Sequence, residues 1–428
     1  MENDIARSKE EKENDDVVET LNLIENDKSS TIPLDICREI LILLPAKSLI
    51  RLRAVSKDWR SVIDDPIFVK AHTDKQLSSK AIIIRNSSDQ PLYSFDLDDL
   101  NFAANGLQKI AASPLDYTPS GLSLLKAFPV SMCNGLILVG GKSWEIWNPL
   151  THERLKLPRI KCNPNPEKEA IGLGYDYTSD DYKVVVIHPH RLHRRRHGRE
   201  NIACQTHAAV VEGSHGPSVL LHGALHWTMF YEPYGINTII AFDLGSEKYR
   251  QMPLPPLEKR AYVGVQERYL SVLDGCLVLS DYSQADSRDD ERELYDVWVM
   301  KDYGVEDSWI KLFSLEDEDC FFCCFEFGRD LRPLAYMKDK TQIFLQHTLY
   351  RGFLIFDVKS NSSKSVEIHG LTGTLHAQCI PRTIFRLHDN CGVNGSVARN
   401  RRRRRMKRTS NMNMSDTNVK LLCERYNI

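Results

Sequence analysis

A strand-and-turn unit recurs along most of this chain, and its period restricts the fold more than any other feature. In each copy a turn containing glycine or aspartate precedes an apolar strand, and the turns are at Gly135, Gly223, Gly275 and Asp339. They are separated by 88, 52 and 64 residues, and residues 171–212 supply the extra copy that the first gap allows. Repeats of roughly 50 residues with three or four strands each are typical of β-propellers. The sequence therefore predicts a propeller, because the alternative, a large sandwich, would show no regular long period.

The same pattern predicts how many blades the propeller has and how its ring closes. Strand-like runs at residues 81–97 precede the first complete repeat, and residues 377–387 follow the last one. The first run would add a blade, and the last would close the ring. We expect about six blades between residues 81 and 388.

A short helical segment, Ile32 to Val69, precedes the repeats and has a different character. Eight of the eleven residues from Leu34 to Leu44 are apolar, Pro45 ends this helix, and two further short helices are predicted at 46–55 and 57–63. Fewer than ~40 residues rarely form an independent core, so the surplus apolar surface needs a cover. On the residues alone, that cover is either a partner protein or the β-domain of the same chain.

The helical segment resembles an F-box. The resemblance rests on Ile32-Pro33, on Leu44-Pro45 after an apolar helix, and on Val55-Ser56-Lys57-Asp58-Trp59. It implies a small three-helix F-box that binds a Skp-type adaptor and, through it, the cullin of a ubiquitin ligase. The adaptor-binding residues that it implies are Ile32, Pro33, Ile36, Leu43, Leu44, Pro45, Leu49, Val55 and Trp59, although Trp59 could instead serve the helical core.

The repeats resemble the kelch-like F-box-associated domain of plant F-box proteins. The phrases that carry the resemblance include Cys133-Asn134-Gly135-Leu136, Trp147-Asn148-Pro149, Gly174-Tyr175-Asp176 and Gly223-Ala224-Leu225-His226-Trp227. The chain departs from the family pattern after Val186, where residues 189–216 are basic, rich in histidine and irregular. This departure predicts that one blade is incomplete or carries a long loop.

The composition of the sequence indicates the expected domain boundaries and the expected cellular compartment. Residues 1–30 hold ten acids and four bases, whereas residues 392–428 hold ten bases and two acids. We expect a disordered acidic N-terminus (1–30), an F-box (31–72), a linker (73–80), the β-domain (81–388) and a disordered basic tail (389–428). The acidic N-terminus is no signal peptide, no apolar run is long enough for a membrane span, and the eleven cysteines are expected to be reduced. The expected location is cytoplasm or nucleus, with Arg401–Arg408 as a possible import signal.

The sequence contains only weak candidates for metal-binding or acid–base residues. The histidines of the run from His188 to His197 alternate with arginines that repel a cation, and the C-x-x-C at Cys320 and Cys323 has no second ligand pair. Asp180-Asp181 fits a turn better than acid–base work. We therefore expect no catalytic residue, no metal and no cofactor.

The function expected from these features is that of a non-catalytic substrate receptor of an SCF-type (Skp-cullin-F-box) ubiquitin ligase. The F-box would bind the adaptor, and the β-domain would hold a target protein whose identity the sequence does not give. Two alternatives stay open: a nucleic-acid-binding or scaffolding propeller that acts through its basic loop and tail, and a catalytic propeller, for which no convergent cluster is found.

Overall fold

The computed structural model contains two compact units, one ending at Lys75 and one beginning at Gln76. The residues that the structure describes are 33–75, 80–86, 92–100, 108–115, 128–140, 144–157, 170–188, 210–232, 236–257, 268–284, 293–317, 331–338, 340–347, 352–371, 375–385, 387 and 419–425. Each unit is described by itself. Along the part of the chain that is described, no helix has the length and apolar character needed to span a membrane.

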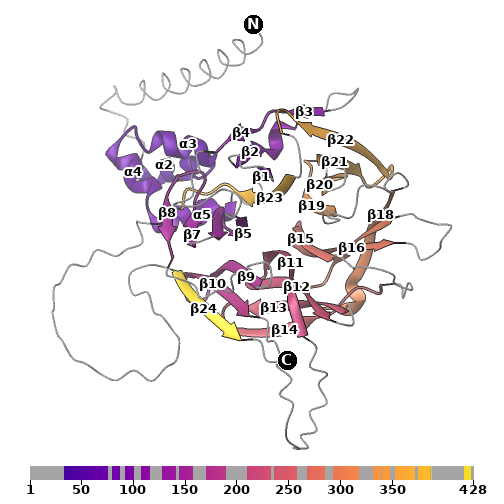
Figure 1. The fold of residues 1–428 in the computed structure, drawn as a ribbon. Helices are drawn as coiled ribbons and strands as arrows, with labels where there is room; N and C mark the ends of the chain where they lie inside the picture. Colours follow the sequence, from indigo (N-terminus) through magenta and orange to yellow (C-terminus); the bar gives the residue numbers. More distant parts are fainter. Residues whose placement is uncertain are drawn as a thin grey trace, which may run out of the picture. The chain divides into compact units, whose positions relative to one another are not determined.

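In the described part of the first unit there are four helices (Figure 1), and they are α2 (Leu34–Leu41), α3 (Ala46–Leu52), α4 (Lys57–Ile63) and α5 (Pro66–Lys75). Ser56 caps α4, because its hydroxyl accepts a hydrogen bond from the backbone nitrogen of Trp59 at 3.1 Å. Helix α5 was not expected. It begins with Pro66 in the first turn, where proline is tolerated, and it extends into the residues expected to be linker.

The core of the helical unit is small and draws on all of α2 to α5. Its buried apolar side chains are Leu41, Ala46, Leu49, Leu52, Val62, Ile63, Phe68 and Val69. Eight such side chains make a marginal core, because domains of this size usually have only a few kcal/mol of stability.

The second unit is built from six sheets, which we number as blades 1 to 6. In sheet order, blade 1 contains β23 (Leu375–Pro381), β1 (Lys80–Asn86), β2 (Tyr93–Asp96) and β4 (Ser113–Pro114), and blade 2 contains β5 (Phe128–Cys133), β6 (Leu136–Gly140), β7 (Glu145–Trp147) and β8 (Arg154–Lys156). Blade 3 contains β24 (Val419–Arg425), β10 (Asp181–His188) and β9 (Ala170–Asp176), and blade 4 contains β11 (Val210–Leu221), β12 (Ala224–Glu232), β13 (Ile236–Asp243) and β14 (Lys248–Met252). Blade 5 contains β15 (Arg268–Leu273), β16 (Cys276–Gln284), β17 (Glu293–Met300) and β18 (Trp309–Asp317), and blade 6 contains β19 (Leu331–Tyr336), β20 (Gln342–His347), β21 (Gly352–Asp357), β22 (Ser362–Ile368) and β3 (Gln108–Ile110). Short 3-10 turns occur at Leu97–Asp99 and Glu306–Ser308.

The blades form a closed ring, because each apolar core is shared by two neighbouring blades. Blades 5 and 6 meet where the rings of Phe313 and Phe356 stack at 4.2 Å. Blade 6 meets blade 1 where Phe95 packs edge-on against Phe344, with 5.9 Å between ring centroids. The other four cores join blades 1–2, 2–3, 3–4 and 4–5 in the same way. The prediction of a propeller of about six blades is confirmed.

Left-handed residues make the tight turns that the repeat predicted. The pairs Asn134–Gly135, His222–Gly223 and Asp274–Gly275 have positive φ at both residues, as a two-residue hairpin turn of type I′ requires. Gly135 is also needed for space, because a Cβ atom there would lie 2.5 Å from the Thr383 side chain. The fourth predicted turn residue, Asp339, lies outside the described residues.

Three strands are added to blades from distant parts of the chain. Strand β23 pairs antiparallel with β1 and closes the ring, as expected for residues 377–387. Strands β3 and β24 pair parallel with β22 and β10. Strand β24 forms at Val419–Arg425, within the segment expected to be a disordered tail, and it lies beside β10.

Candidate functional site

The nine residues expected to bind an adaptor occupy different environments in the helical unit. Pro33, Ile36, Leu43, Pro45 and Val55 are exposed, Leu44 and Trp59 are partly buried, Leu49 is fully buried, and Ile32 lies outside the described residues. Leu49 is therefore a core residue of the free helical unit and not part of its surface. It lies on the inner side of α3, where a helix this short must place its apolar stripe to form any core.

The exposed apolar residues of α2 and its C-terminal turn form one face. Ile36, Ile40 and Leu43 follow one another at spacings of four and three residues, and they are 51%, 50% and 61% exposed. Residues at these spacings lie above one another on a helix. We call this set the α2 apolar face.

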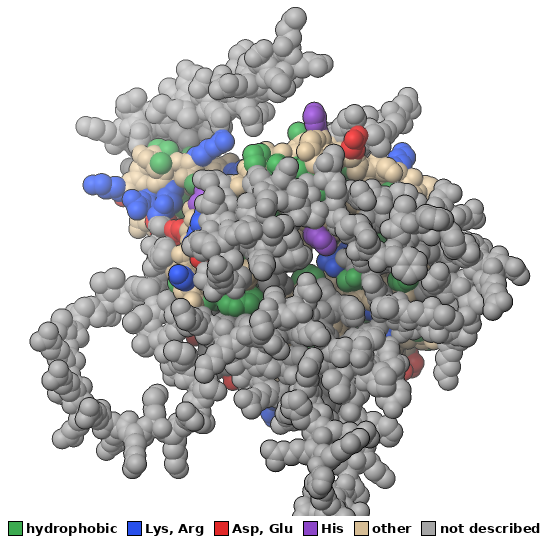
Figure 2. Space-filling view, viewed as in Figure 1, with side chains coloured by type: hydrophobic (Ala, Val, Ile, Leu, Met, Phe, Trp, Pro, Cys, Tyr) green, Lys and Arg blue, Asp and Glu red, His purple; other side chains and the backbone are tan. Residues whose placement is uncertain are grey.

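Two more exposed apolar residues of the unit are Val55 before α4 and Ile67 in the first turn of α5. Among the described residues, nine large apolar side chains are exposed, and five of them belong to this small unit. Figure 2 shows hydrophobic and basic side chains exposed together over the helices. Such a density of exposed apolar side chains marks an interaction surface.

Sequence reasoning missed Ile40 and Ile67. The signal for Ile40 was available, because it lies one helical turn after Ile36, on the same side. Ile67 carried no comparable signal, since α5 was not expected.

The turn that carries Leu43 and Leu44 is held by a buried histidine of α5. The Nε2–H group of His72 donates to the carbonyl oxygen of Leu44 at 2.9 Å, and its ring stacks on Phe68 with 6.0 Å between centroids. Burial lowers the pKa of His72, against a smaller opposing effect of the Leu44 carbonyl. A neutral His72 therefore fixes the end of the α2 apolar face to α5.

A second anchor consists of two aspartates between α4 and α5. Arg38 Nη2 of α2 pairs with Asp65 Oδ2 at 2.9 Å, and Arg53 Nη2 after α3 donates to Asp64 Oδ2 at 2.8 Å. Arg60 also lies 3.5 Å from Asp64. Three helices are thus tied to one corner by arginine–carboxylate pairs, which hold the exposed residues in a fixed arrangement.

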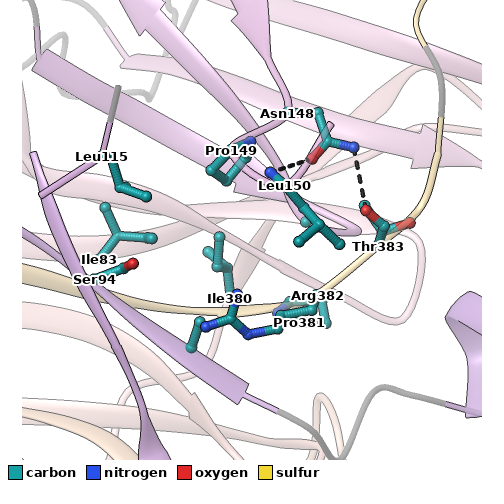
Figure 3. Close-up of a pocket in the computed structure, with 12 residues that line it drawn as sticks. Ile83, Ser94, Leu115, Asn148, Pro149, Leu150, Ile380, Pro381, Arg382 and Thr383 are labelled. Carbon is teal, nitrogen blue, oxygen red and sulfur yellow. Dashed lines mark hydrogen bonds between the residues drawn. The ribbon is translucent and has the colours of Figure 1, made fainter. Parts of the chain in front are cut away.

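The propeller has a small hollow between blades 1 and 2, shown in Figure 3. Its volume is about 20 Å³, which is room for about one water molecule. Asn148 lies beside it and donates to the carbonyl oxygens of Thr383 at 3.2 Å and Phe385 at 2.7 Å, while its side-chain oxygen accepts from the Leu150 nitrogen at 2.9 Å. Asn148 of the Trp147-Asn148-Pro149 motif therefore connects the residues that follow the closing strand β23 to blade 2, and the hollow is part of this structural contact.

A larger open groove lies between turns of blades 3 and 4, with a volume of about 470 Å³. The lining residues are Asp176, Tyr177, Thr178, His222, Gly223, Asp243, Gly245 and Ser246. Asp243 already accepts from the Ser246 nitrogen at 2.7 Å, which with the Ser246 side chain keeps its pKa low. Asp176 is equally engaged, as described next, so the groove offers no carboxylate poised for proton transfer.

Asp176 of β9 forms a buried ion pair with Lys183 of β10 in blade 3, next to a turn of blade 4. Lys183 Nζ lies 2.8 Å from Asp176 Oδ2, 2.6 Å from the Leu244 carbonyl oxygen and 3.0 Å from Glu247 Oε1. Burial alone raises the pKa of Asp176, but hydrogen bonds from Lys183, Ser179 and Thr178 outweigh it and hold that pKa well below its ordinary range. The Asp176–Lys183 pair has a structural role, because all three acceptors of the Lys183 ammonium group belong to blades 3 and 4 themselves.

The other candidate groups of the sequence carry no chemistry in the described part of the chain. Asp180 has a φ of 57° in the turn between β9 and β10, which confirms its interpretation as a turn residue. His188 ends β10, whereas the following histidines, the C-x-x-C at Cys320 and the run Arg401–Arg408 lie outside the described residues. Within the described ranges, no group of three or more His, Cys, Asp or Glu side chains is placed to hold a metal ion.

Comparisons with known proteins agree with this two-part architecture. The family profile of the F-box domain matches residues 29–70, and that of the F-box associated beta propeller domain matches residues 107–391. The F-box protein CPR1 of Arabidopsis thaliana is 29% identical over 390 residues, which cover 82% of this chain and 88% of that protein. An F-box/kelch-repeat protein of Arabidopsis thaliana is 28% identical over 306 residues, covering 66% of this chain and 79% of that protein. The propeller profile spans more than half of the sequence, and the chain therefore belongs to the family of F-box proteins with an F-box-associated β-propeller domain.

Proposed function

We propose that this chain is the substrate-recognition subunit of an SCF-type ubiquitin ligase. Its helical unit binds a Skp-type adaptor, which connects it to a cullin, and its propeller holds a target protein. F-box proteins with a β-propeller generally serve as such receptors, and the chain has both domains in that order.

The observation that carries the proposal is the α2 apolar face. Ile36, Ile40 and Leu43 remain half or more exposed in a unit whose core is already filled by other side chains. Covering a half-exposed Leu or Ile contributes about 1 kcal/mol, and aligned residues on one face can be covered by one partner groove. Val55 and Ile67 are two further exposed apolar side chains of the same helical unit.

The propeller contributes binding and not chemistry in this proposal. A receptor increases the rate of ubiquitination by holding its target near a charged conjugating enzyme, which raises the effective concentration of the reactants. The buried carboxylates and the lysine of blades 3 and 4 are consumed by structural contacts, which supports a role in binding.

Paired point variants of the full chain test the adaptor surface. We expect Ile40→Asp with Leu43→Asp to abolish capture of a purified Skp-type adaptor, because two carboxylates would be desolvated in an apolar contact. The matched control is Ile310→Asp, which places a carboxylate at a 44% exposed isoleucine of β18 in the propeller. Equal capture by all three chains would refute this use of the α2 apolar face.

A further inference from the structure

Blade 3 differs from blades 4 and 5 in where its strands come from. In blades 4 and 5, four consecutive strands of the chain form each sheet, whereas among the described residues blade 3 receives β9 and β10 from its own repeat. The next strand that the structure describes, β11, already belongs to blade 4. One side of β10 would therefore present unpaired backbone groups if nothing else joined it.

The C-terminal strand β24 occupies this side of β10. It pairs in parallel over seven residues, from Tyr182 with Val419 to His188 with Arg425 (Figure 1). The pairs within the other repeats, and β9 with β10, are antiparallel. In the described part of the chain, β24 is therefore an added segment at the side of β10 and not a strand of the same repeat.

We propose that the outer edge of β10 is a strand-binding site for an extended segment of a partner protein, and that β24 occupies it as an internal competitor. The pairing of β10 with β24 is the juxtaposition that carries the proposal. Addition of a peptide strand to an open sheet edge is an established mode of recognition between proteins. The site is distinct from the α2 apolar face and does not depend on adaptor binding.

The way β24 is attached makes it replaceable. Thirty-one residues separate Leu387, the last described residue after β23, from Val419. A strand supplied by a distant part of the same chain binds with an effective concentration on the order of 1 mM, so a partner segment of moderate affinity can compete. Parallel pairing is also slightly less stable per residue than antiparallel pairing.

The surroundings of β10 indicate what kind of segment fits. Val184 and Val186 lie in the core shared with blade 2, whereas Val185 and Ile187 lie in the core shared with blade 4. Both faces of the sheet are thus apolar at the centre of the strand. Strand β24 has three successive apolar residues, Leu421-Leu422-Cys423, opposite this centre. We expect the partner segment to be about seven residues long, with consecutive apolar residues at its centre and no proline there.

A labelled peptide and full-length variants test the site. The probe is a fluorescein-labelled peptide with the sequence of residues 417–427, kept under reducing conditions. Leu421→Pro with Leu422→Pro disables the internal strand, because alternate N–H groups face β10 and two consecutive prolines remove at least one of them. Met414→Pro with Ser415→Pro is the matched control in the same tail, before β24.

We expect the double-proline variant in β24 to bind the peptide about tenfold more tightly than the unaltered and control chains, because the internal competitor is removed. A peptide that carries the same two prolines should not bind any of the chains. Equal affinity of all three chains, or no binding to the β24 variant, would refute the proposal.

A second measurement uses the unaltered chain and does not depend on the folding of a variant. Several-fold excess of the peptide over ~1 mM should displace β24 and raise the hydrogen exchange of Val419–Arg425, while the amides of β10 stay protected. Unchanged exchange of the C-terminal segment under these conditions would show that the edge does not accept a second strand.

Discussion

The same substitution, leucine to alanine, should have different effects on folding and on adaptor binding at two leucines of the helical unit. Leu43, on the α2 apolar face, is 61% exposed, whereas Leu49 in α3 is completely buried. Leu43→Ala should leave folding nearly unchanged and weaken adaptor binding, whereas Leu49→Ala should remove adaptor binding by unfolding the unit.

The magnitudes follow from burial. Burying a whole leucine contributes ~1.5–3 kcal/mol, so covering the exposed part of Leu43 contributes about 1–2 kcal/mol, or ~5–30-fold in affinity. Removing the buried Leu49 side chain costs ~2–5 kcal/mol of unfolding free energy. A unit of this size has only ~3–5 kcal/mol to lose, so Leu49→Ala would remove most of the stability of the helices.

Calorimetric titration with a purified Skp-type adaptor gives the affinities, and hydrogen exchange of residues 34–75 in the full chain reports local unfolding. Leu43→Ala should keep native protection with weaker binding. Equal affinity of the Leu43→Ala and unaltered chains would refute the assignment of this surface. Native protection in Leu49→Ala would refute the account of the core.

Three further predictions concern the buried polar contacts. The pKa of His72 is lowered in the folded unit, so the unfolded chain binds the proton first as the pH falls. The hydrogen-exchange protection of the helices should therefore fall as the pH drops below about 6.5 towards the lowered pKa of the folded unit, and it should stay constant above pH 6.5. His72→Gln should remove this pH dependence. Asn148→Ala leaves the carbonyl groups of Thr383 and Phe385 without this donor and should cost ~2–4 kcal/mol in denaturant unfolding of the propeller, whereas the exposed Lys359→Ala should change little. Lys183→Met leaves a buried Asp176 carboxylate uncompensated and should cost ~3–5 kcal/mol, part of which the added change Asp176→Asn should restore; a loss within experimental error would contradict the buried pair.

The local features of this fold follow from the sequence because they depend on neighbouring residues. Ser56 caps α4 as its position before an apolar helix predicts, and Asn134–Gly135 makes the tight turn that its residue types favour. The period of these turns was enough to predict the propeller, since each repeat must bury its faces against its neighbours.

The remaining features depend on pairings that no local pattern encodes. Nothing near Val419–Arg425 in the sequence indicates that this segment joins β10, because the vacancy is created more than two hundred residues earlier. The burial of Leu49 was also not predictable, because Leu49 and Leu43 have equal hydrophobicity and only the packing of three helices decides which one faces inwards.

The most direct test of the central claim is the affinity of a purified Skp-type adaptor for the intact chain and for a chain that lacks residues 31–75, the whole helical unit. Circular dichroism of the shortened chain confirms that its propeller remains folded. The account predicts that the intact chain binds the adaptor with a 1:1 stoichiometry and that the shortened chain does not bind it. Equal binding by both chains, or binding by neither, would contradict the claim that this helical unit connects the propeller to a ubiquitin ligase.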